Sequence, residues 1–179
     1  MVRLMNKIER ENFIIKTADD QSIEKYISSI LELYLKRWEQ QPSESISTFY
    51  NLLKSCYEQN ILRLDIMWYK DKAVAGIASF IDRRKNAIAP FIMPWDDSFK
   101  SYSPGKLMML CLIRDAIEKQ YAECDFMRGD EAYKYQLGAV NRYTENVSII
   151  RKNKYYYFKN IYSRTKLKRF VNLNFQHRF

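Results

Sequence analysis

The sequence predicts an α/β fold with a mixed, mostly antiparallel central sheet flanked by helices. The first observation is the order of the segments, helix–helix–strand–strand–strand–helix–strand–helix–strand, which follows from their hydrophobic spacing. The second is a hairpin within 61–82, whose strands must be antiparallel. The third is a strand–helix–strand section around 87–127, which predicts a right-handed parallel crossover. One domain is therefore expected over 1–153, followed by a basic aromatic segment over 154–179.

The first third of the chain is predicted to be mainly helical. A short strand or an extended lead-in over 7–17 precedes helix-start residues around Asp19. Apolar residues then recur at three- and four-residue spacing, which predicts an amphipathic helix over about 20–39. A second helix is predicted on the same grounds, roughly over 46–59.

The middle of the chain is predicted to form three strands. Apolar residues alternate over 62–68, as they do on a half-buried strand, and a returning strand over 73–81 completes the hairpin. A third strand is expected over 87–93. Pro90 has no backbone N–H to donate to a ladder, so it predicts a bulge or a broken edge in that strand.

The remaining elements follow a central helix over Pro104–Lys119. Its apolar residues occupy well over half of its circumference, which predicts that the helix is largely covered. A short strand is expected over 122–127, a short helix or turn around 130–138, and a last strand near 143–151.

The charge of the chain is distributed unevenly. Residues 151–179 hold nine Lys and Arg residues and no acidic residue, which accounts for the whole formal net charge of +9. One interpretation of this tail is a closing strand and a solvated helix. The other is a surface for anionic lipid head groups or RNA phosphates. The body is neutral and needs no polyanionic partner.

The composition excludes several kinds of site and indicates a cytoplasmic protein. His177 is the only histidine, which excludes a His-based triad or a His-rich zinc site in the body, and no metal is expected. Cys56, Cys111 and Cys124 show no CxxC spacing and are interpreted as buried free thiols in a reducing compartment. No membrane span and no secretory signal are expected.

The start of the central helix, Ser103-Pro104-Gly105-Lys106, is a candidate anion site. Ser103 is predicted to cap the helix through its hydroxyl, and Pro104 falls where a missing N–H costs nothing. Gly105 lets a ligand approach the backbone, and Lys106 adds a cation beside the positive end of the helix dipole. Such a start suits a pyrophosphate, although an ordinary helix start with Gly105 for close packing has the same sequence.

A second motif begins about twenty residues later, at Cys124-Asp-Phe-Met-Arg-Gly-Asp-Glu-Ala-Tyr-Lys-Tyr135. It is predicted to be a short strand that breaks into a turn dense with charged and phenolic side chains. One interpretation is a solvated turn with an ion network of Arg128 with Asp130 or Glu131. The other is a catalytic turn.

With these two motifs in this order, the chain resembles the GNAT acyltransferase superfamily, and within it the CelD-like acetyltransferase branch related to the Fem-type aminoacyltransferases. That branch shows a Ser-Pro-Gly start of a leucine-rich helix, followed by an Asp-Phe-x-x-Gly-x-Glu-x-Tyr-Lys turn. The resemblance covers about 60–152 well and 1–59 loosely. The matching residues are Ser103, Pro104, Gly105, Asp125, Phe126, Gly129, Glu131, Tyr133 and Lys134.

The resemblance implies a GNAT fold that binds acetyl-CoA or another acyl-CoA. First-turn amides of the helix at Ser103–Lys106 would bind the CoA diphosphate, and Lys106 would pair with a phosphate oxygen. A bulge at Pro90 would turn the Phe91 N–H toward the thioester carbonyl as an oxyanion donor. The glycine-rich loop of other GNAT enzymes is absent, so that Gly105 is the remaining glycine of this cradle.

The resemblance also implies roles in the turn. Asp125 or Glu131 would be the base that takes the ammonium proton, and Tyr133 or Tyr135 the acid that protonates the leaving thiolate. Arg128 and Lys134 would hold a substrate carboxylate or phosphate. Trp68, Trp95 and Tyr102 are interpreted as core or pocket wall, because their spacing shows no nucleic-acid module.

The expected function is therefore acyl-CoA-dependent N-acyl transfer to a small-molecule amine. Two alternatives stay open: a non-catalytic GNAT-like module that pairs with a partner unit or an anionic surface, and an aminoacyl-tRNA-dependent Fem-like transferase. Many relatives carry two tandem units and this chain has room for one. It is therefore expected to be a single unit, the C-terminal unit of a tandem pair, or a homodimer.

Overall fold

A computed structural model describes residues 10–38 and 43–142 of the chain, and it leaves out the side chains of residues 43–45. The chain divides into two compact units, 1–140 and 141–179, and the elements named here belong to the first. The predicted strand near 143–151, the predicted boundary at 153 and the basic segment over 154–179 lie outside the described residues.

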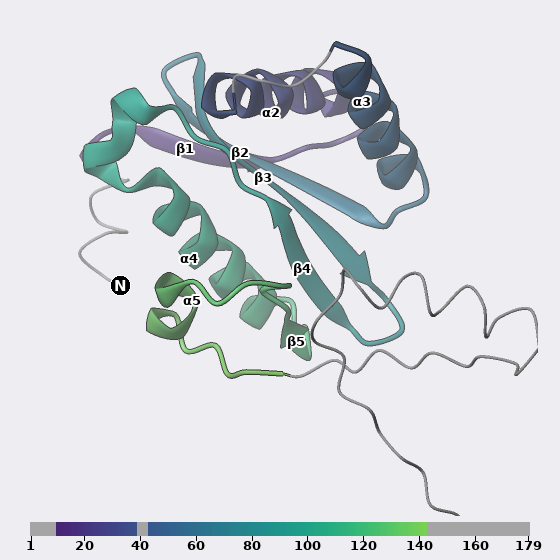
Figure 1. The fold of residues 1–179 in the computed structure, drawn as a ribbon, viewed down its shortest axis with the longest axis vertical. Helices are drawn as coiled ribbons and strands as arrows, with labels where there is room; N and C mark the ends of the chain where they lie inside the picture. Colours follow the sequence, from purple (N-terminus) through teal and green to yellow (C-terminus); the bar gives the residue numbers. More distant parts are fainter. Residues whose placement is uncertain (1–9, 39–42, 143–179) are drawn as a thin grey trace, which may run out of the picture. The chain divides into compact units, whose positions relative to one another are not determined.

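The described residues form a five-stranded sheet with the order β1-β2-β3-β4-β5 (Figure 1). Strands β1 to β4 pair antiparallel with their neighbours, whereas β5 pairs parallel with β4 after the crossover through helix α4. The predicted mixed α/β fold is thereby confirmed. The strands are β1 (Phe13–Thr17), β2 (Leu62–Tyr69), β3 (Lys72–Asp82), β4 (Ala87–Ile92) and β5 (Glu123–Cys124).

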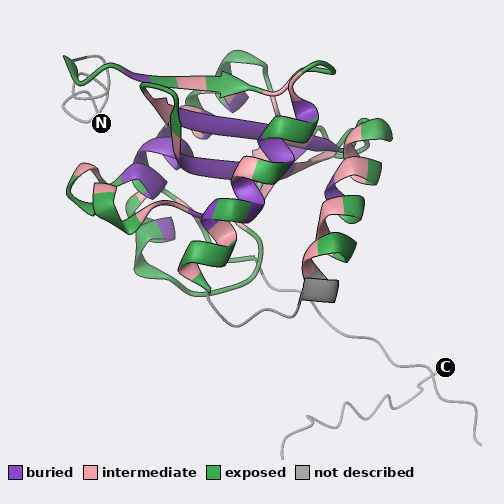
Figure 2. Ribbon diagram, turned by 90° about the horizontal axis from the view of Figure 1, so that it is seen from above, coloured by how far each residue is buried: buried purple, intermediate pink, exposed green. Residues whose placement is uncertain are grey.

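Helices cover both faces of the sheet, and the apolar side of each helix explains its place. Helices α2 (Ile23–Arg37) and α3 (Ser43–Glu58) lie on one face, and α4 (Pro104–Glu118) and α5 (Ala132–Gln136) lie on the other (Figure 1). Ile27 and Ile30 of α2 are fully buried against β2 and β3, as their spacing predicts. The central strands β2 and β3 are largely buried between the helical layers, whereas β1 is mostly exposed (Figure 2).

Several boundaries differ from the predicted ones, and side chains near them explain why. The first helix begins at Ile23 because Asp19 and Ser22 form a turn, in which the Ser22 N–H donates to the Asp19 carboxylate at 2.9 Å. Strand β5 ends at Cys124 because the Asp125 carboxylate accepts from the Met127 N–H at 2.7 Å, which turns the chain. The predicted loop over 94–102 contains the 3₁₀ helix η1 (Asp97–Tyr102), which Asp96 caps.

The bulge predicted at Pro90 is present. Pro90 lies opposite Ser79, and the next pair along the ladder joins Ile92 to Ala78. Phe91 is therefore the extra residue of β4 and has no partner position on β3.

A buried ion network ties α4 to the sheet. Arg63 of β2 donates from Nε to both carboxylate oxygens of Asp65, at 3.1 and 2.9 Å, and from Nη1 to Asp115 of α4. Asp65 also accepts from the Thr17 hydroxyl of β1 at 2.5 Å. The side chains of Arg63 and Asp65 are 11% and 5% exposed, so the network holds α4 against β2 from inside the domain.

The three cysteines are free, as predicted, but each is only partly buried. Burial, with help from Asp125 and Glu123, raises the pKa of the Cys124 thiol to about 11, and burial also raises the pKa of Cys111. Both thiols are therefore protonated at neutral pH, which excludes them as ready nucleophiles. Over the described ranges, no helix has the length and apolarity that a membrane crossing requires.

Candidate active site

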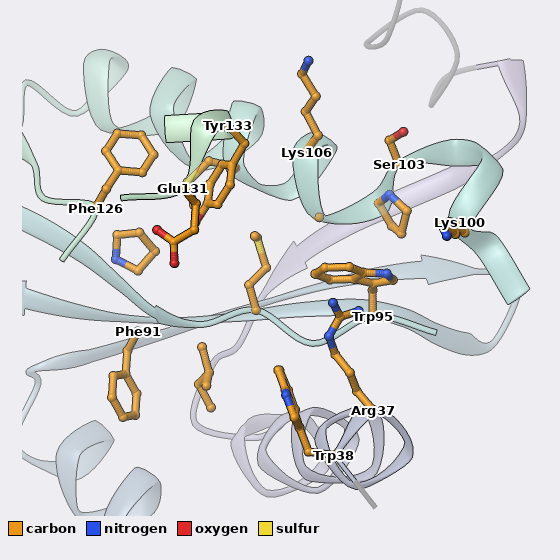
Figure 3. A pocket seen from close by; sticks show the side chains of 16 residues that line it. Arg37, Trp38, Phe91, Trp95, Lys100, Ser103, Lys106, Phe126, Glu131 and Tyr133 are labelled. Carbon is orange, nitrogen blue, oxygen red and sulfur yellow. The ribbon is translucent and has the colours of Figure 1, made fainter. Parts of the chain in front are cut away.

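The candidate site lies where β4 and β5 part. The two strands pair only at Ala87–Glu123 and Ile88–Cys124, and the last bond between the segments runs from the Asp125 N–H to the Ile88 carbonyl at 2.9 Å. Beyond Ile88, the outer edge of β4 faces a cavity of about 640 Å³ (Figure 3). The cavity is lined by residues 90–93 of β4 and its continuation, by the start of α4, by the turn before α5 and by the end of α2.

The start of α4 contributes Ser103, Pro104, Gly105 and Lys106 to this cavity, as the first motif predicts. Ser103 lies at the N-cap position and Pro104 at the first helical position. The prediction that the Ser103 hydroxyl caps the helix is wrong. Ser103 has a left-handed backbone, with φ of 51°, and its side chain makes no capping hydrogen bond.

The missing cap bears on anion binding. The first helical bond runs from the Leu107 N–H to the Ser103 carbonyl at 3.1 Å, so the N–H groups of Gly105 and Lys106 precede the helical ladder. A helix start with such amides and the positive end of the dipole suits an anion. The Lys106 side chain extends from the same turn toward solvent (Figure 3).

Gly105 makes room for the indole of Trp95. A Cβ at position 105 would lie 3.2 Å from two indole carbons and 3.5 Å from the terminal methyl of Met93. The interpretation of Gly105 as a close-packing residue is thus supported, and Trp95 is a pocket wall, as predicted. Arg37 lies over the same indole, with its guanidinium carbon 3.3 Å from the ring centroid.

The turn before α5 places Glu131 in the cavity. Lys134 is buried, and its Nζ donates to the carbonyls of Arg128 and Gly129 at 2.8 and 3.4 Å and pairs with Glu131 at 2.8 Å. Gly129 has a φ of 112°, and a Cβ there would lie 2.5 Å from the Glu131 carboxylate, so this fold of the turn requires glycine. Hydrogen bonding to Lys134 lowers the pKa of Glu131, which keeps the carboxylate ionised at neutral pH.

The structure separates the predicted residues of this turn into two groups. Glu131 and Tyr133 line the cavity beside Phe126, whereas Asp125, Arg128 and Tyr135 do not (Figure 3). Asp125 closes the turn after β5, and the Tyr135 hydroxyl donates to Asp130. Of the described acids, neither Asp130 nor Glu131 pairs with Arg128, so the predicted ion network is replaced by the one around Lys134.

The contacts of Lys134 lie within the turn itself. Its buried ammonium group is used by the turn itself, so a substrate would have to displace one of these acceptors to reach it. Arg128, the other predicted substrate contact, is exposed and lies off the cavity. The structure therefore gives no support to either residue as a substrate ligand.

Sequence reasoning missed the contribution of α2. Arg37 and Trp38 at its end, together with Lys100 of η1, line the cavity. Phe91 also lines it, and the Phe91 ring lies on the same side of β4 as Trp38 (Figure 3). No local pattern marks Arg37 or Trp38, because they continue an ordinary amphipathic helix and reach the site only through the fold.

Comparison with known proteins agrees with this architecture. Residues 3–135 match the family model described as acetyltransferase (GNAT) domain. No curated protein matches the sequence.

Solved structures with a similar fold are also acetyltransferases. An aminoglycoside acetyltransferase, meta-AAC0020, from an uncultured soil metagenomic sample, solved with sisomicin, is 15% identical with a TM-score of 0.55, over 96% of this chain and 99% of that chain. A predicted acetyltransferase from Clostridium acetobutylicum, solved with acetyl-CoA, is 13% identical with a TM-score of 0.56, over 77% of this chain and 96% of that chain. An acetyltransferase from Trypanosoma brucei is 14% identical with a TM-score of 0.56, over 77% and 99%.

These likenesses show the fold, and the family match covers well over half of the chain and every residue named as lining the cavity. The more specific resemblance to the CelD-like branch stays a prediction. The parted strands β4 and β5, the bulge in β4 and the helix start at Ser103 are the features that the GNAT resemblance implies. The chain belongs to the GNAT acetyltransferase family.

Proposed function

We propose that the protein transfers an acyl group from acetyl-CoA or another acyl-CoA to the amino group of a small molecule. The observation on which the proposal rests is the cavity at the free edge of β4, which brings the start of α4, a place that suits an anion, together with Glu131 and Tyr133. The structural neighbour solved with acetyl-CoA supports the choice of co-substrate.

The acyl-CoA would lie on the α4 side of β4. Its diphosphate would accept from the Gly105 and Lys106 N–H groups at the start of α4, with Lys100 and Lys106 as nearby cations. Its pantetheine arm carries amide groups, and the free edge of β4 offers backbone groups with which such amides pair. The thioester would then reach the bulge at Phe91.

The acyl transfer divides the chemistry among three groups. The free amine attacks the thioester carbonyl, and the Phe91 N–H stabilises the oxyanion that develops. When the resulting tetrahedral intermediate collapses, the C–S bond breaks and the Tyr133 hydroxyl protonates the leaving thiolate. Glu131, through water, accepts the proton that the amine loses and releases it to solvent, and Tyr133 regains its proton from solvent.

Glu131 is a better candidate base than Asp125 because of its position. Glu131 lines the cavity and is held ionised by Lys134, whereas the Asp125 carboxylate is used by the turn after β5. Both were equally acceptable as bases from the sequence alone.

The direct test is binding of the co-substrate. Acetyl-CoA is expected to raise the thermal midpoint, because a ligand at a hundredfold excess over its Kd stabilises the folded state by about 2.7 kcal/mol. Isothermal titration with acetyl-CoA and free CoA would measure the Kd itself. If neither ligand binds, the proposed function is wrong.

Replacing Tyr133 with phenylalanine is expected to lower turnover about a hundredfold and leave the Kd for acetyl-CoA nearly unchanged. The reason is that a general acid acts mainly in the transition state. Thiol release measured at saturating acetyl-CoA gives the rate.

The matched control is Tyr135→Phe, which removes a hydroxyl that is bonded to Asp130 outside the cavity. Equal turnover of the two variants would show that Tyr133 is not the acid.

A further inference from the structure

The half of the cavity on the α2 side is aromatic. Trp38 and Phe91 line it and remain 41% and 42% exposed, so their faces are available to a ligand. Part of each ring also packs within the protein, because Arg37 lies over Trp38 at 5.3 Å and both rings belong to a continuous row of ring contacts along α2, α3, β4 and β3. The row joins Trp38 to Tyr34 (4.6 Å between centroids), Tyr34 to Phe49 (5.6 Å), Phe49 to Phe91 (6.3 Å) and Phe91 to Phe80 (5.0 Å).

The indole of Trp95 separates this half from the helix start. One set of its ring atoms lies against Gly105 of α4, and the guanidinium of Arg37 lies over the ring from α2 (Figure 3). Arg37 is therefore screened from an anion at the start of α4. Its side chain is 26% exposed, and its ion pair with the exposed Asp97 is long, at 3.6 Å. The guanidinium thus keeps donors for a ligand on the α2 side.

The charge of the cavity disfavours a polycationic acceptor. Among its described lining residues, Arg37, Lys100 and Lys106 are cationic, and the single acid, Glu131, is neutralised by Lys134. An acceptor with several ammonium groups would meet like charge and find no described carboxylate that is free to bind it. Aromatic faces and a stacked arginine instead suit a flat apolar body that carries an anionic group.

We infer that the acceptor is a monoamine with an aromatic body and a carboxylate, the class of the aromatic amino acids. This inference rests on the proposed function. Arg37 binds the carboxylate, and Trp38 and Phe91 pack against the ring. The amine, which is next to the carboxylate, is thereby held at the bulge of β4 where the thioester carbonyl would lie.

The test compares matched acceptors with acetyl-CoA as donor. L-Phenylalanine and 2-phenylethylamine share the ring and the amine and differ in the carboxylate, and sisomicin represents a polycation. We expect kcat/KM for L-phenylalanine to exceed that for each of the other two by about tenfold to a hundredfold, the usual effect of one charge-assisted contact.

Variants of Arg37 locate the carboxylate contact. Arg37→Gln should lower kcat/KM for L-phenylalanine about tenfold or more and leave that for 2-phenylethylamine nearly unchanged, and Arg37→Lys should recover part of the loss. If Arg37 only supported Trp95, Arg37→Gln would lower kcat/KM for both acceptors equally. The matched control is Arg114→Gln, because Arg114 is exposed on α4 and does not line the cavity.

The outcomes separate this inference from the proposed function. If acetyl-CoA binds but sisomicin has the higher kcat/KM, the inference is overturned and the proposed function stands. The same conclusion follows if Arg37→Gln lowers kcat/KM for L-phenylalanine and 2-phenylethylamine equally. If acetyl-CoA does not bind, both are overturned. The inference is supported if Arg37→Gln lowers kcat/KM for L-phenylalanine alone and Arg114→Gln does not.

Discussion

Replacing Arg63 with leucine is expected to lower the free energy of unfolding by about 3–5 kcal/mol, the usual cost of removing one partner from a buried ion pair. The variant leaves Asp65, whose side chain is 5% exposed, without its cationic partner, and it also releases Asp115 of α4. Urea unfolding followed by circular dichroism measures the difference.

The matched control for this prediction is Arg114→Leu. Arg114 is 60% exposed and lies 3.8 Å from Glu118, so its loss should change stability by no more than about 0.5 kcal/mol. The double variant Arg63→Leu with Asp65→Leu should recover much of the loss, because no buried charge is then left unpaired. If Arg63→Leu is no worse than Arg114→Leu, the network does not stabilise the fold.

The stability that the network gives should depend on pH. Burial opposes ionisation of Asp115, but its bonds to Arg63 and Lys119 outweigh burial, and the pKa of Asp115 is lowered below 3.8. A carboxylate with a lowered folded pKa stabilises the protein above its unfolded pKa and loses that contribution as the pH falls through the folded pKa. The difference in free energy of unfolding between the wild type and Arg63→Leu should therefore become smaller below pH 3.8.

Replacing Gly105 with aspartate is expected to abolish the thermal shift that acetyl-CoA produces. The new Cβ would lie 3.2 Å from the indole of Trp95, which Arg37 blocks from behind, and the new carboxylate would oppose a diphosphate at the start of α4. Thermal unfolding with and without acetyl-CoA, compared with the wild type, measures the shift.

Two further variants keep this prediction decisive. Ile117→Asp adds the same charge to α4 at a position that is 71% exposed and off the cavity, so it should leave the shift intact. If Gly105→Asp does not fold, Lys106→Glu reverses the charge at an exposed position of the same turn and should weaken acetyl-CoA binding. An unchanged shift in folded Gly105→Asp would contradict the assignment of this helix start to CoA.

Local sequence patterns were enough to predict the helices, the strands and the bulge in β4. Local spacing predicted the helices, the hairpin and the parallel crossover, because the periods of helix and strand are properties of neighbouring residues. Pro90 predicted the bulge because a residue without an N–H interrupts a ladder wherever it lies. The two motifs also brought Gly105, Glu131 and Tyr133 to one cavity, as the family resemblance implied.

Which groups of these motifs face the cavity depends on the packing of the folded chain. Asp125 and Glu131 have the same chemistry in the same turn, but Asp125 accepts from the Met127 N–H and lies off the cavity, whereas Glu131 pairs with Lys134 and lines the cavity. Lys134 has the charge of a substrate ligand, but it is buried and donates to the Arg128 carbonyl within the turn. Arg37 and Trp38 reach the site from a helix that ends more than sixty residues before the first motif. Such contacts depend on how the layers pack, which local spacing does not encode.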